Sequence, residues 1–291
     1  MHSYRIGKLN IRLEGGRIPL EEDRWMQPFA ISRGDPDLLY RLEKVDFSPF
    51  DSAKSIQNSA VHELLEIEAG LFVMSHWANC RYGYGFRLRE LYEKNTVTVY
   101  ANSRLSPEAT FPISRILSTL GLHGKFLQRG AGVLHASYID YRGSAILFAA
   151  PSQTGKSTQA SLWEQFAGAE IINGDRALVE KREGKWFAHG YPCCGSSLIC
   201  INRSLPLAAI VILRQGRENR VEELTPGEKL RALVSGTEVY PWYGEDVENA
   251  LSFAQALTAE VPVIRLVCRP DEQAVTVLQQ YLERYAHENN K

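Results

Sequence analysis

Apolar and polar side chains alternate along several runs in the first hundred residues of the chain. These runs cover 5–14, 39–47, part of 61–75 and 86–101. A period of two places the apolar side chains on one face of a strand, so the runs predict half-buried antiparallel strands, two of them within 86–101. The front of the chain is therefore expected to be rich in β-structure.

The pattern changes near residue 104. Ser106 and Pro107 are typical of a helix cap and a first helical position, and apolar residues at helical spacing follow them. Beyond that helix the pattern predicts strands at 133–141, 144–150, 169–173, 176–181, 185–190, 206–215 and 262–269, and helices at 157–168, 228–236, 247–260 and 270–286. Because strands alternate with helices here, we predict an α+β chain of two domains. The first is a β-rich domain for substrate or partner recognition at 1–103, and the second is an α/β domain at 104–291.

Composition excludes several classes of protein. The 291 residues are 44% hydrophobic and 23% charged, with a formal net charge of -1, which is typical of a soluble globular protein. Near-neutral charge argues against a nucleic-acid partner bound by a broad basic surface, although a local basic groove stays open. The five cysteines lack CxxC spacing, so they indicate no disulfide or zinc framework. With apolar runs far below the roughly 20 residues of a membrane span and no apolar signal core, we expect a cytoplasmic protein that binds no membrane.

Residues 150–158, Ala-Pro-Ser-Gln-Thr-Gly-Lys-Ser-Thr, match the phosphate-loop pattern GxxxxGK[ST] except that Ala150 replaces the first glycine. A predicted buried strand precedes them and a predicted helix follows. Gly155 would let backbone N–H groups approach phosphate, Lys156 would bridge the outer phosphates, and Ser157 would hold Mg²⁺. The predicted nucleotide-binding residues are Ser152, Gln153, Thr154, Gly155, Lys156, Ser157 and Thr158. The alternative is a plain turn between strand and helix with a solvent-exposed lysine.

Asp175 follows the predicted strand 169–173 and lies in the tetrapeptide Asn-Gly-Asp-Arg. An acid at the end of the strand after the loop helix can reach the phosphate end of such a site. There it would bind Mg²⁺ or accept a proton from an attacking hydroxyl. The alternative is a turn aspartate that follows Gly174.

Three segments resemble, in this order, the HPr kinase/phosphorylase family, whose relatives are the nucleotide-type phosphoenolpyruvate carboxykinases. They are Leu-His-Ala at 134–136, the loop at 150–158 and Asn-Gly-Asp-Arg-Ala-Leu-Val at 173–179. The resemblance implies a P-loop kinase domain of that type, with ATP and Mg²⁺ as cofactors. It matches Asp175 to the acid assigned as general base, and His135 to a histidine near the transferred phosphate. Taken by itself, His135 would be a strand histidine with a core or surface role.

The chain also departs from that family. Gly174 stands where the family has the first acid of a pair, and Thr158 stands where it has an acid after the loop serine. The stretch 189–197, His-Gly-Tyr-Pro-Cys-Cys-Gly-Ser-Ser, replaces a second signature centred on Glu-Ile-Arg-Gly. We therefore expect an HPr-kinase-like protein other than the carbon-catabolite regulator, with Ser157 and Asp175 as the remaining metal ligands. Its layout is also similar, in arrangement, to kinases that phosphorylate a serine of small biosynthetic peptides.

Two further loops are candidates for the same site. The segment 190–197 is dense in Gly, Pro and Ser, and it follows a predicted hairpin that would return it toward the phosphate site, where Ser196 and Ser197 would donate hydrogen bonds. The alternative is a structural turn with a buried cysteine. Arg214 would end the strand 206–215 beside the phosphates, or belong to an exposed basic loop.

These observations predict an ATP-dependent kinase that transfers the γ-phosphate to a hydroxyl, with Asp175, Lys156 and His135 as catalytic residues. The acceptor would be a serine of a peptide or protein. A small-molecule hydroxyl and a nucleotide-binding regulatory module without catalysis remain as alternatives, and self-association stays open.

Overall fold

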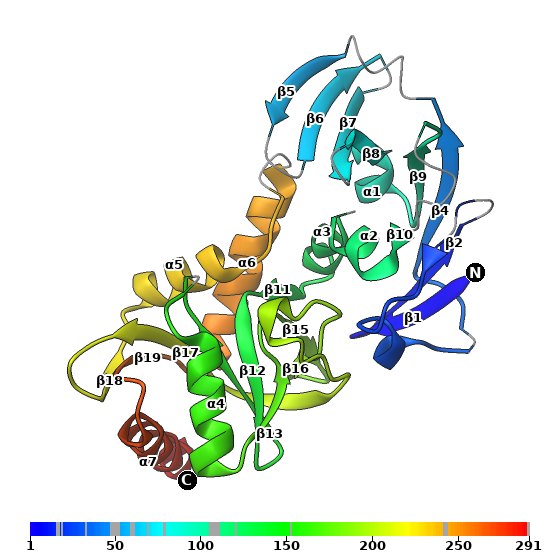
Figure 1. The fold of residues 1–291 in the computed structure, drawn as a ribbon. Coiled ribbons are helices and arrows are strands. Elements are labelled where there is room, and N and C mark those ends of the chain that lie inside the picture. Colours follow the sequence, from blue (N-terminus) through cyan, green and yellow to red (C-terminus); the bar gives the residue numbers. More distant parts are fainter. Residues whose placement is uncertain are drawn as a thin grey trace. The chain divides into compact units, whose positions relative to one another are not determined.

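The chain forms a mixed α/β protein with extensive sheets in a computed structural model (Figure 1). The structure describes residues 1–291 apart from 16–17, 19, 33, 47–52, 59–61, 69, 78–79, 105–110, 120, 152, 241–243 and 290–291. Contacts between residues divide it into two compact units, one of 1–125 with 240–244 and one of 126–239 with 245–291. Along the chain, the first division thus falls between Lys125 and Phe126, whereas the sequence pattern changes near residue 104. Ser106 and Pro107, the predicted helix start, lie outside the described residues.

The first unit contains an eight-stranded sheet with the order β1-β2-β4-β9-β8-β7-β6-β5. Its strands are β1 (His2–Ile6), β2 (Leu9–Glu14), β4 (Leu38–Val45), β5 (Lys54–Asn58), β6 (His62–Ile67), β7 (Gly70–Trp77), β8 (Cys80–Arg87) and β9 (Thr96–Asn102), and β3 (Leu20–Glu21) pairs with β10 (Phe111–Pro112). Its helices are α1 (Leu88–Glu93), α2 (Ile113–Thr119) and the start of α3 (Leu122–Leu127). The expected β-rich front is confirmed.

Two expectations for this unit were wrong. The segment 88–93 forms the helix α1 because its buried residues Leu88, Leu91 and Tyr92 follow helical spacing. In addition, β4 pairs in parallel with both β2 and β9, although we predicted antiparallel strands. Alternation of apolar and polar residues cannot distinguish these arrangements, because successive side chains point to opposite faces in both.

The second unit is built around the long strand β17 (Ser204–Gln215). Its other strands are β11 (Gly132–Leu134), β12 (Ala136–Tyr141), β13 (Ser144–Ala149), β14 (Glu170–Asn173), β15 (Ala177–Arg182), β16 (Lys185–His189), β18 (Arg220–Glu223) and β19 (Val263–Cys268). Its helices are α4 (Lys156–Ala167), α5 (Pro226–Gly236), α6 (Gly244–Glu260) and α7 (Glu272–Asn289). The strands β13, β17 and β19 run parallel side by side, and β12 and β14 continue the sheet in antiparallel pairings.

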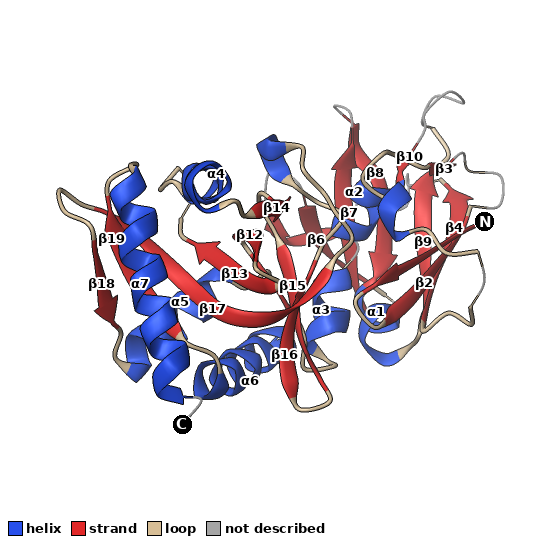
Figure 2. Ribbon diagram, turned by 90° about the horizontal axis from the view of Figure 1, so that it is seen from below, coloured by secondary structure: helices blue, strands red, loops and turns tan. Residues whose placement is uncertain are grey.

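Both faces of the central strands are covered by helices. Ile146 and Phe148 of β13 pack with α4 and α7, whereas Ala145, Leu147 and Ala149 pack with α5 and α6. Figure 2 shows the two pairs of helices on opposite sides of the sheet. Burial on both faces explains why 145–150 is apolar throughout instead of alternating. None of the described helices combines the length and the apolar character needed to cross a membrane.

A group of buried polar side chains joins the hairpin β15–β16 to the start of β17. Glu180 Oε1 lies 3.2 Å from His189 Nε2 and accepts a hydrogen bond from Arg182 Nε at 2.6 Å, while His189 Nδ1 lies 2.6 Å from Ser204 Oγ. Burial acts to raise the pKa of Glu180, but the contacts with His189 and Arg182 outweigh it, so the pKa lies below the ordinary 4.5. Glu180 therefore stabilises the fold as a carboxylate.

We expect Glu180→Gln to lower the free energy of unfolding by about 1–3 kcal/mol at pH 7, because it weakens a charged hydrogen bond in a buried place. The pKa is lowered in the folded state, so the contribution of the carboxylate is complete above pH 4.5 and is lost as the pH falls through the folded-state value. Urea unfolding at pH 7, 5 and 4 measures this. A difference between native protein and variant that stays constant with pH would contradict the assignment.

Candidate functional site

The loop between β13 and α4 has a backbone conformation that allows a ligand to approach it closely. Gly155 precedes the helix with φ of 114°, and Gln153 has φ of 64°. A φ of 114° suits glycine far better than any residue with a Cβ. Since Gly155 has no side chain to cap α4, the first N–H groups of the helix are left for an external acceptor. The loop thus has the properties of an anion site.

Lys156 lies at the start of α4 and is 8% exposed. Its ammonium donates a hydrogen bond to the carbonyl oxygen of Ala150 at 3.0 Å, across the loop. Burial lowers the pKa of Lys156, and Asp175 opposes this effect while Arg176 adds to it. The alternative of a solvent-exposed lysine does not describe this side chain. A poorly hydrated ammonium favours binding of an anion.

Asp175 is held at the end of β14 by the buried residue Asn173. The side-chain oxygen of Asn173 accepts hydrogen bonds from the backbone N–H of Asp175 at 2.9 Å and from the backbone N–H of Arg176 at 3.0 Å. Its Nδ2 donates to the carbonyl oxygen of Tyr191 at 2.8 Å. One amide side chain therefore fixes the turn that presents Asp175 and ties it to the next loop.

The carboxylate of Asp175 lies between His135 and Arg176. His135 Nε2 lies 3.0 Å from Asp175 Oδ1, and Arg176 NH1 donates to Asp175 Oδ2 at 2.7 Å. The hydrogen bond from His135 and the charge of Arg176 outweigh burial and lower the pKa of Asp175. The group is thus ionised at neutral pH and retains lone pairs for a further partner.

The segment 190–197, here called the cysteine loop, returns to Asp175 as the sequence predicted. Cys193 Sγ accepts a hydrogen bond from Arg176 NH1 at 2.7 Å, and burial raises the pKa of its thiol. A Cβ on Gly195 would lie 2.8 Å from the carboxyl carbon of Asp175. The loop therefore packs on the acid without adding a charge. Among the described residues, no group of three or more His, Cys, Asp and Glu is arranged to hold a metal ion.

Ser197 of this loop occupies the space beside Gly174. A Cβ built on Gly174 would lie 2.2 Å from Ser197 Oγ and 2.3 Å from Ser197 Cβ. The hydroxyl of Ser197 is held in place by its hydrogen bond to the carbonyl oxygen of Cys194 at 2.7 Å. A side chain at position 174 and the side chain of Ser197 therefore exclude each other. The side chain of Ser196 lies outside the described residues.

Most of the predicted site residues line one pocket of about 300 Å³, here called the loop pocket. Its lining residues are His135, Gln153, Gly155, Lys156, Ser157, Thr158, Gly174 and Asp175. Thr154 lines a neighbouring pocket on the α4 and α7 side of the sheet, which Thr158 also lines. Ser152 lies outside the described residues. Arg214 is exposed and lines neither pocket, whereas its neighbour Gln215 lines the second.

Sequence reasoning missed Asn173 and Arg176 as parts of the site. Both belong to the segment 173–179 that was singled out, so the signal was the local run of polar residues after a buried strand. Their roles depend on the cysteine loop and on Glu238, which accepts a hydrogen bond from Arg176 Nε at 3.0 Å. Those partners are distant in sequence, and only the fold brings them to the same place.

A family model described as SynChlorMet cassette protein ScmC matches residues 111–268, more than half of the chain. The comparison with curated proteins found no match. Among solved structures, the chain is similar to one described as the Hpr(Ser) kinase/phosphatase from Coxiella burnetii. The TM-score is 0.32 at 10% sequence identity, and the likeness covers 54% of this chain and 96% of the other.

We expect Gly174→Asp to destabilise the fold by about 1–3 kcal/mol, because the new side chain overlaps Ser197. The double variant Gly174→Asp with Ser197→Gly should recover most of that loss. Urea unfolding of the two single variants and the double variant gives the coupling between the positions. Additive effects would show that the two side chains do not compete for one space.

Proposed function

The chain belongs to the SynChlorMet cassette protein ScmC family, and for this member we propose ATP-dependent transfer of the γ-phosphate to a hydroxyl. The observation that carries this proposal is the pairing of charges in the loop pocket. A buried, poorly hydrated Lys156 and an ionised Asp175 line the same pocket at the start of α4. An anion site beside a carboxylate is what phosphoryl transfer to a hydroxyl needs.

The residues of the loop fit a nucleotide triphosphate. The left-handed backbone at Gly155 and the uncapped N–H groups of α4 provide donors for phosphate oxygens. The ammonium of Lys156 would bind the outer phosphates. It would either give up its hydrogen bond to the Ala150 carbonyl or keep that bond and donate its other N–H groups to phosphate. Ser157 and Asp175 would hold Mg²⁺, which supplies neutralisation of the charge on the phosphates. Thr158 lines both the loop pocket and its neighbour, so it would contact the inner phosphates.

The proposed chemical step transfers one proton and one phosphoryl group. The hydroxyl oxygen of the acceptor forms a bond to the γ-phosphorus while the bond to the bridging oxygen of ADP breaks, and Asp175 takes the hydroxyl proton. Because the pKa of Asp175 is lowered, its carboxylate is unprotonated at neutral pH and able to accept this proton. His135 and Arg176 hold the carboxylate in position. A kinase domain similar to HPr kinase, acting on a serine of a peptide or protein, is the form that we propose.

One observation favours a second candidate function. Ser197 excludes a side chain at 174. The proposed site therefore has one acid, whereas the resemblance to the HPr kinase/phosphorylase family implies a pair. A nucleotide-binding module without catalysis is consistent with that loss. ADP release, followed in ATP and Mg²⁺ with serine peptides and small hydroxyl compounds, distinguishes the two functions. Binding of ATP without turnover for every acceptor would favour the module.

We expect Lys156→Met to abolish ADP release and weaken ATP binding strongly while the fold stays intact. Methionine keeps the unbranched length of the buried side chain but removes the charge that binds phosphate. Isothermal titration with the non-hydrolysable ATP analogue AMP-PNP, together with a thermal unfolding curve, checks this. Lys185→Met on β16 is the matched control, since Lys185 is exposed and outside the pocket. Native ATP turnover in Lys156→Met would overturn the proposed function.

We expect Asp175→Asn to lower kcat about 100-fold or more, while the affinity for ATP changes little, because the amide cannot accept the proton. Steady-state turnover and titration with the same analogue in Mg²⁺ measure the two effects. Equal losses in kcat and in nucleotide affinity would instead assign Asp175 to the metal ion alone.

A further inference from the structure

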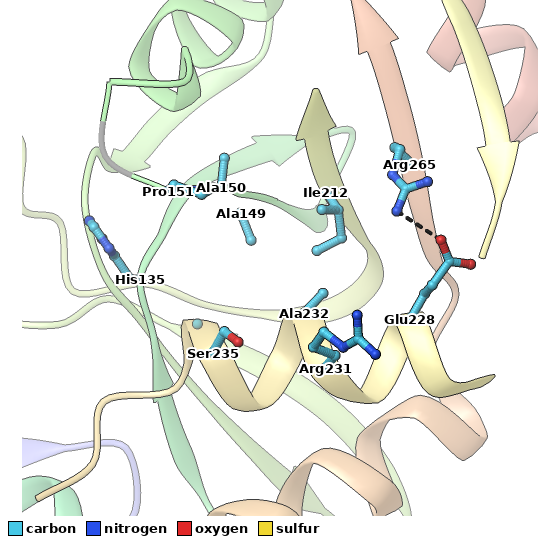
Figure 3. A pocket seen from close by; sticks show the side chains of 11 residues that line it. His135, Ala149, Ala150, Pro151, Ile212, Glu228, Arg231, Ala232, Ser235 and Arg265 are labelled. Atoms are coloured by element: carbon cyan, nitrogen blue, oxygen red, sulfur yellow. Dashed lines mark hydrogen bonds and ion pairs between the residues drawn. The ribbon is translucent and has the colours of Figure 1, made fainter. Parts of the chain in front are cut away.

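A larger pocket of about 450 Å³ adjoins the loop pocket and shares His135 with it (Figure 3). Five residues of α5 line one side at helical spacing, namely Glu228, Arg231, Ala232, Ser235 and Gly236. The opposite side is formed by the sheet and by the first residues of the β13–α4 loop. We call it the helix pocket. Its volume lies within the range of pockets that hold small ligands or short peptide segments.

The register of the parallel strands creates the sheet side of this pocket. Ala149 of β13 pairs with Ile212 of β17, and Ile212 pairs with Arg265 of β19. The three residues form one row across the sheet, with their side chains on the face toward α5, as Figure 3 shows. The row ends at the loop because β13 ends at Ala149. The pocket therefore runs from the carboxyl end of β13 outward along α5.

His135 is fixed at the inner end of the helix pocket. Its backbone N–H donates to the carbonyl oxygen of Gly236 at the end of α5, at 2.8 Å. Its ring contacts Asp175 in the loop pocket at 3.0 Å. A molecule in the helix pocket that extends past His135 therefore reaches the proposed base. The small side chains of Ala149, Ala150 and Ala232 leave the space open between the two ends.

The outer end of the pocket carries one cation without a matching acid. Arg265 donates to Glu228 Oε1 at 3.2 Å and to Glu222 Oε2 at 3.3 Å. Arg220 donates to Glu222 Oε1 at 2.7 Å, so the two arginines balance the two glutamates in charge. Glu228 Oε2 is occupied by the backbone N–H and hydroxyl of Thr225, at 2.9 and 2.8 Å. Within the described part of the chain, no acid forms an ion pair with Arg231, an exposed residue of α5 that lines the pocket (Figure 3).

We propose that the helix pocket holds the hydroxyl acceptor, and that this acceptor carries a carboxylate that Arg231 binds. The binding of the acceptor's hydroxyl group near Asp175 rests on the proposed phosphoryl transfer. The binding of its carboxylate depends on Arg231 alone. The apolar surface of Ile212 and the alanines accommodates the carbon skeleton between the two groups. Arginine suits a carboxylate because its planar donors bind both oxygens. The carboxylate belongs to a free hydroxy acid or to an acidic residue next to a serine in a peptide.

Paired probes on the full chain test the carboxylate end without any turnover. The peptide pair is acetyl-Gly-Ser-Asp-Gly-amide and acetyl-Gly-Ser-Asn-Gly-amide, and the small-molecule pair is glycerate and glycerol. Each is titrated into the protein with AMP-PNP and Mg²⁺ present, and binding is followed by isothermal titration or by NMR shifts. We expect the acidic member of one pair to bind about tenfold more tightly than its neutral partner. The pair that shows the preference identifies the source of the carboxylate.

Two variants of α5 separate a specific contact from a general charge effect. Arg231→Gln and Lys229→Gln remove the same charge from the same helix at similar helix propensity, but Lys229 does not line the pocket. We expect Arg231→Gln to abolish the tenfold preference and Lys229→Gln to retain it. A preference that survives Arg231→Gln, that both variants abolish, or that neither pair shows in the native protein would overturn the assignment.

Ala232→Leu tests the pocket itself. The larger side chain fills the space while it preserves the helix, and Ala232 does not line the loop pocket. We expect the variant to lose binding of the acidic probe at least tenfold and to bind AMP-PNP as before. Unchanged binding of the probe would place the acceptor elsewhere. If the preference and the Ala232→Leu effect are found but no probe is phosphorylated, the carboxylate site stands and the proposed transfer fails. Transfer to glycerol as readily as to glycerate would overturn the carboxylate inference alone.

Discussion

The burial of β13 on both faces determines where the second unit can have polar and charged side chains. Alternate side chains of the strand belong to two separate cores, one with α4 and α7 and one with α5 and α6. A polar group within the strand would have to be buried without water, so charged side chains lie beyond its two ends. The parallel neighbours β17 and β19 end at the same edge. The loop pocket, its neighbour and the helix pocket all lie there, on either side of the β13–α4 loop.

The charges at this edge are unequally satisfied. Asp175 contacts His135 and Arg176, and Arg176 is shared with Glu238 and the thiol of Cys193. Lys156, in contrast, is buried with a backbone carbonyl as its hydrogen-bond partner. A carboxylate with neutralising partners is stable in place, whereas an under-hydrated ammonium gains from an added anion. This asymmetry supports phosphate binding at Lys156 beside an acid that stays ionised.

The cysteine loop packs closely against Gly174 and Asp175. Gly174 and Ser197 share one small volume, and Gly195 approaches the carboxyl of Asp175 closely. Asp175 is the acid that lines the loop pocket among the described residues. On the proposed mechanism, Asp175 would accept the proton of the acceptor hydroxyl and would hold Mg²⁺ together with Ser157.

The sequence by itself determined the local parts of this protein. Most strands and helices after residue 132 follow from apolar runs, glycine positions and short motifs, because these features depend on neighbouring residues. The strand β18 was not predicted, and the single strand expected at 133–141 is divided into β11 and β12, which pair with different partners. The helix at 88–93 was missed because a short run of apolar residues can match the spacing of a helix as well as that of a strand. Only the tertiary structure decided that Lys156 is buried, that Ser197 fills the space at Gly174, and that Arg231 faces the row of Ala149, Ile212 and Arg265. Those contacts join residues far apart in the chain, and their existence depends on strand register and helix packing, which no local pattern encodes.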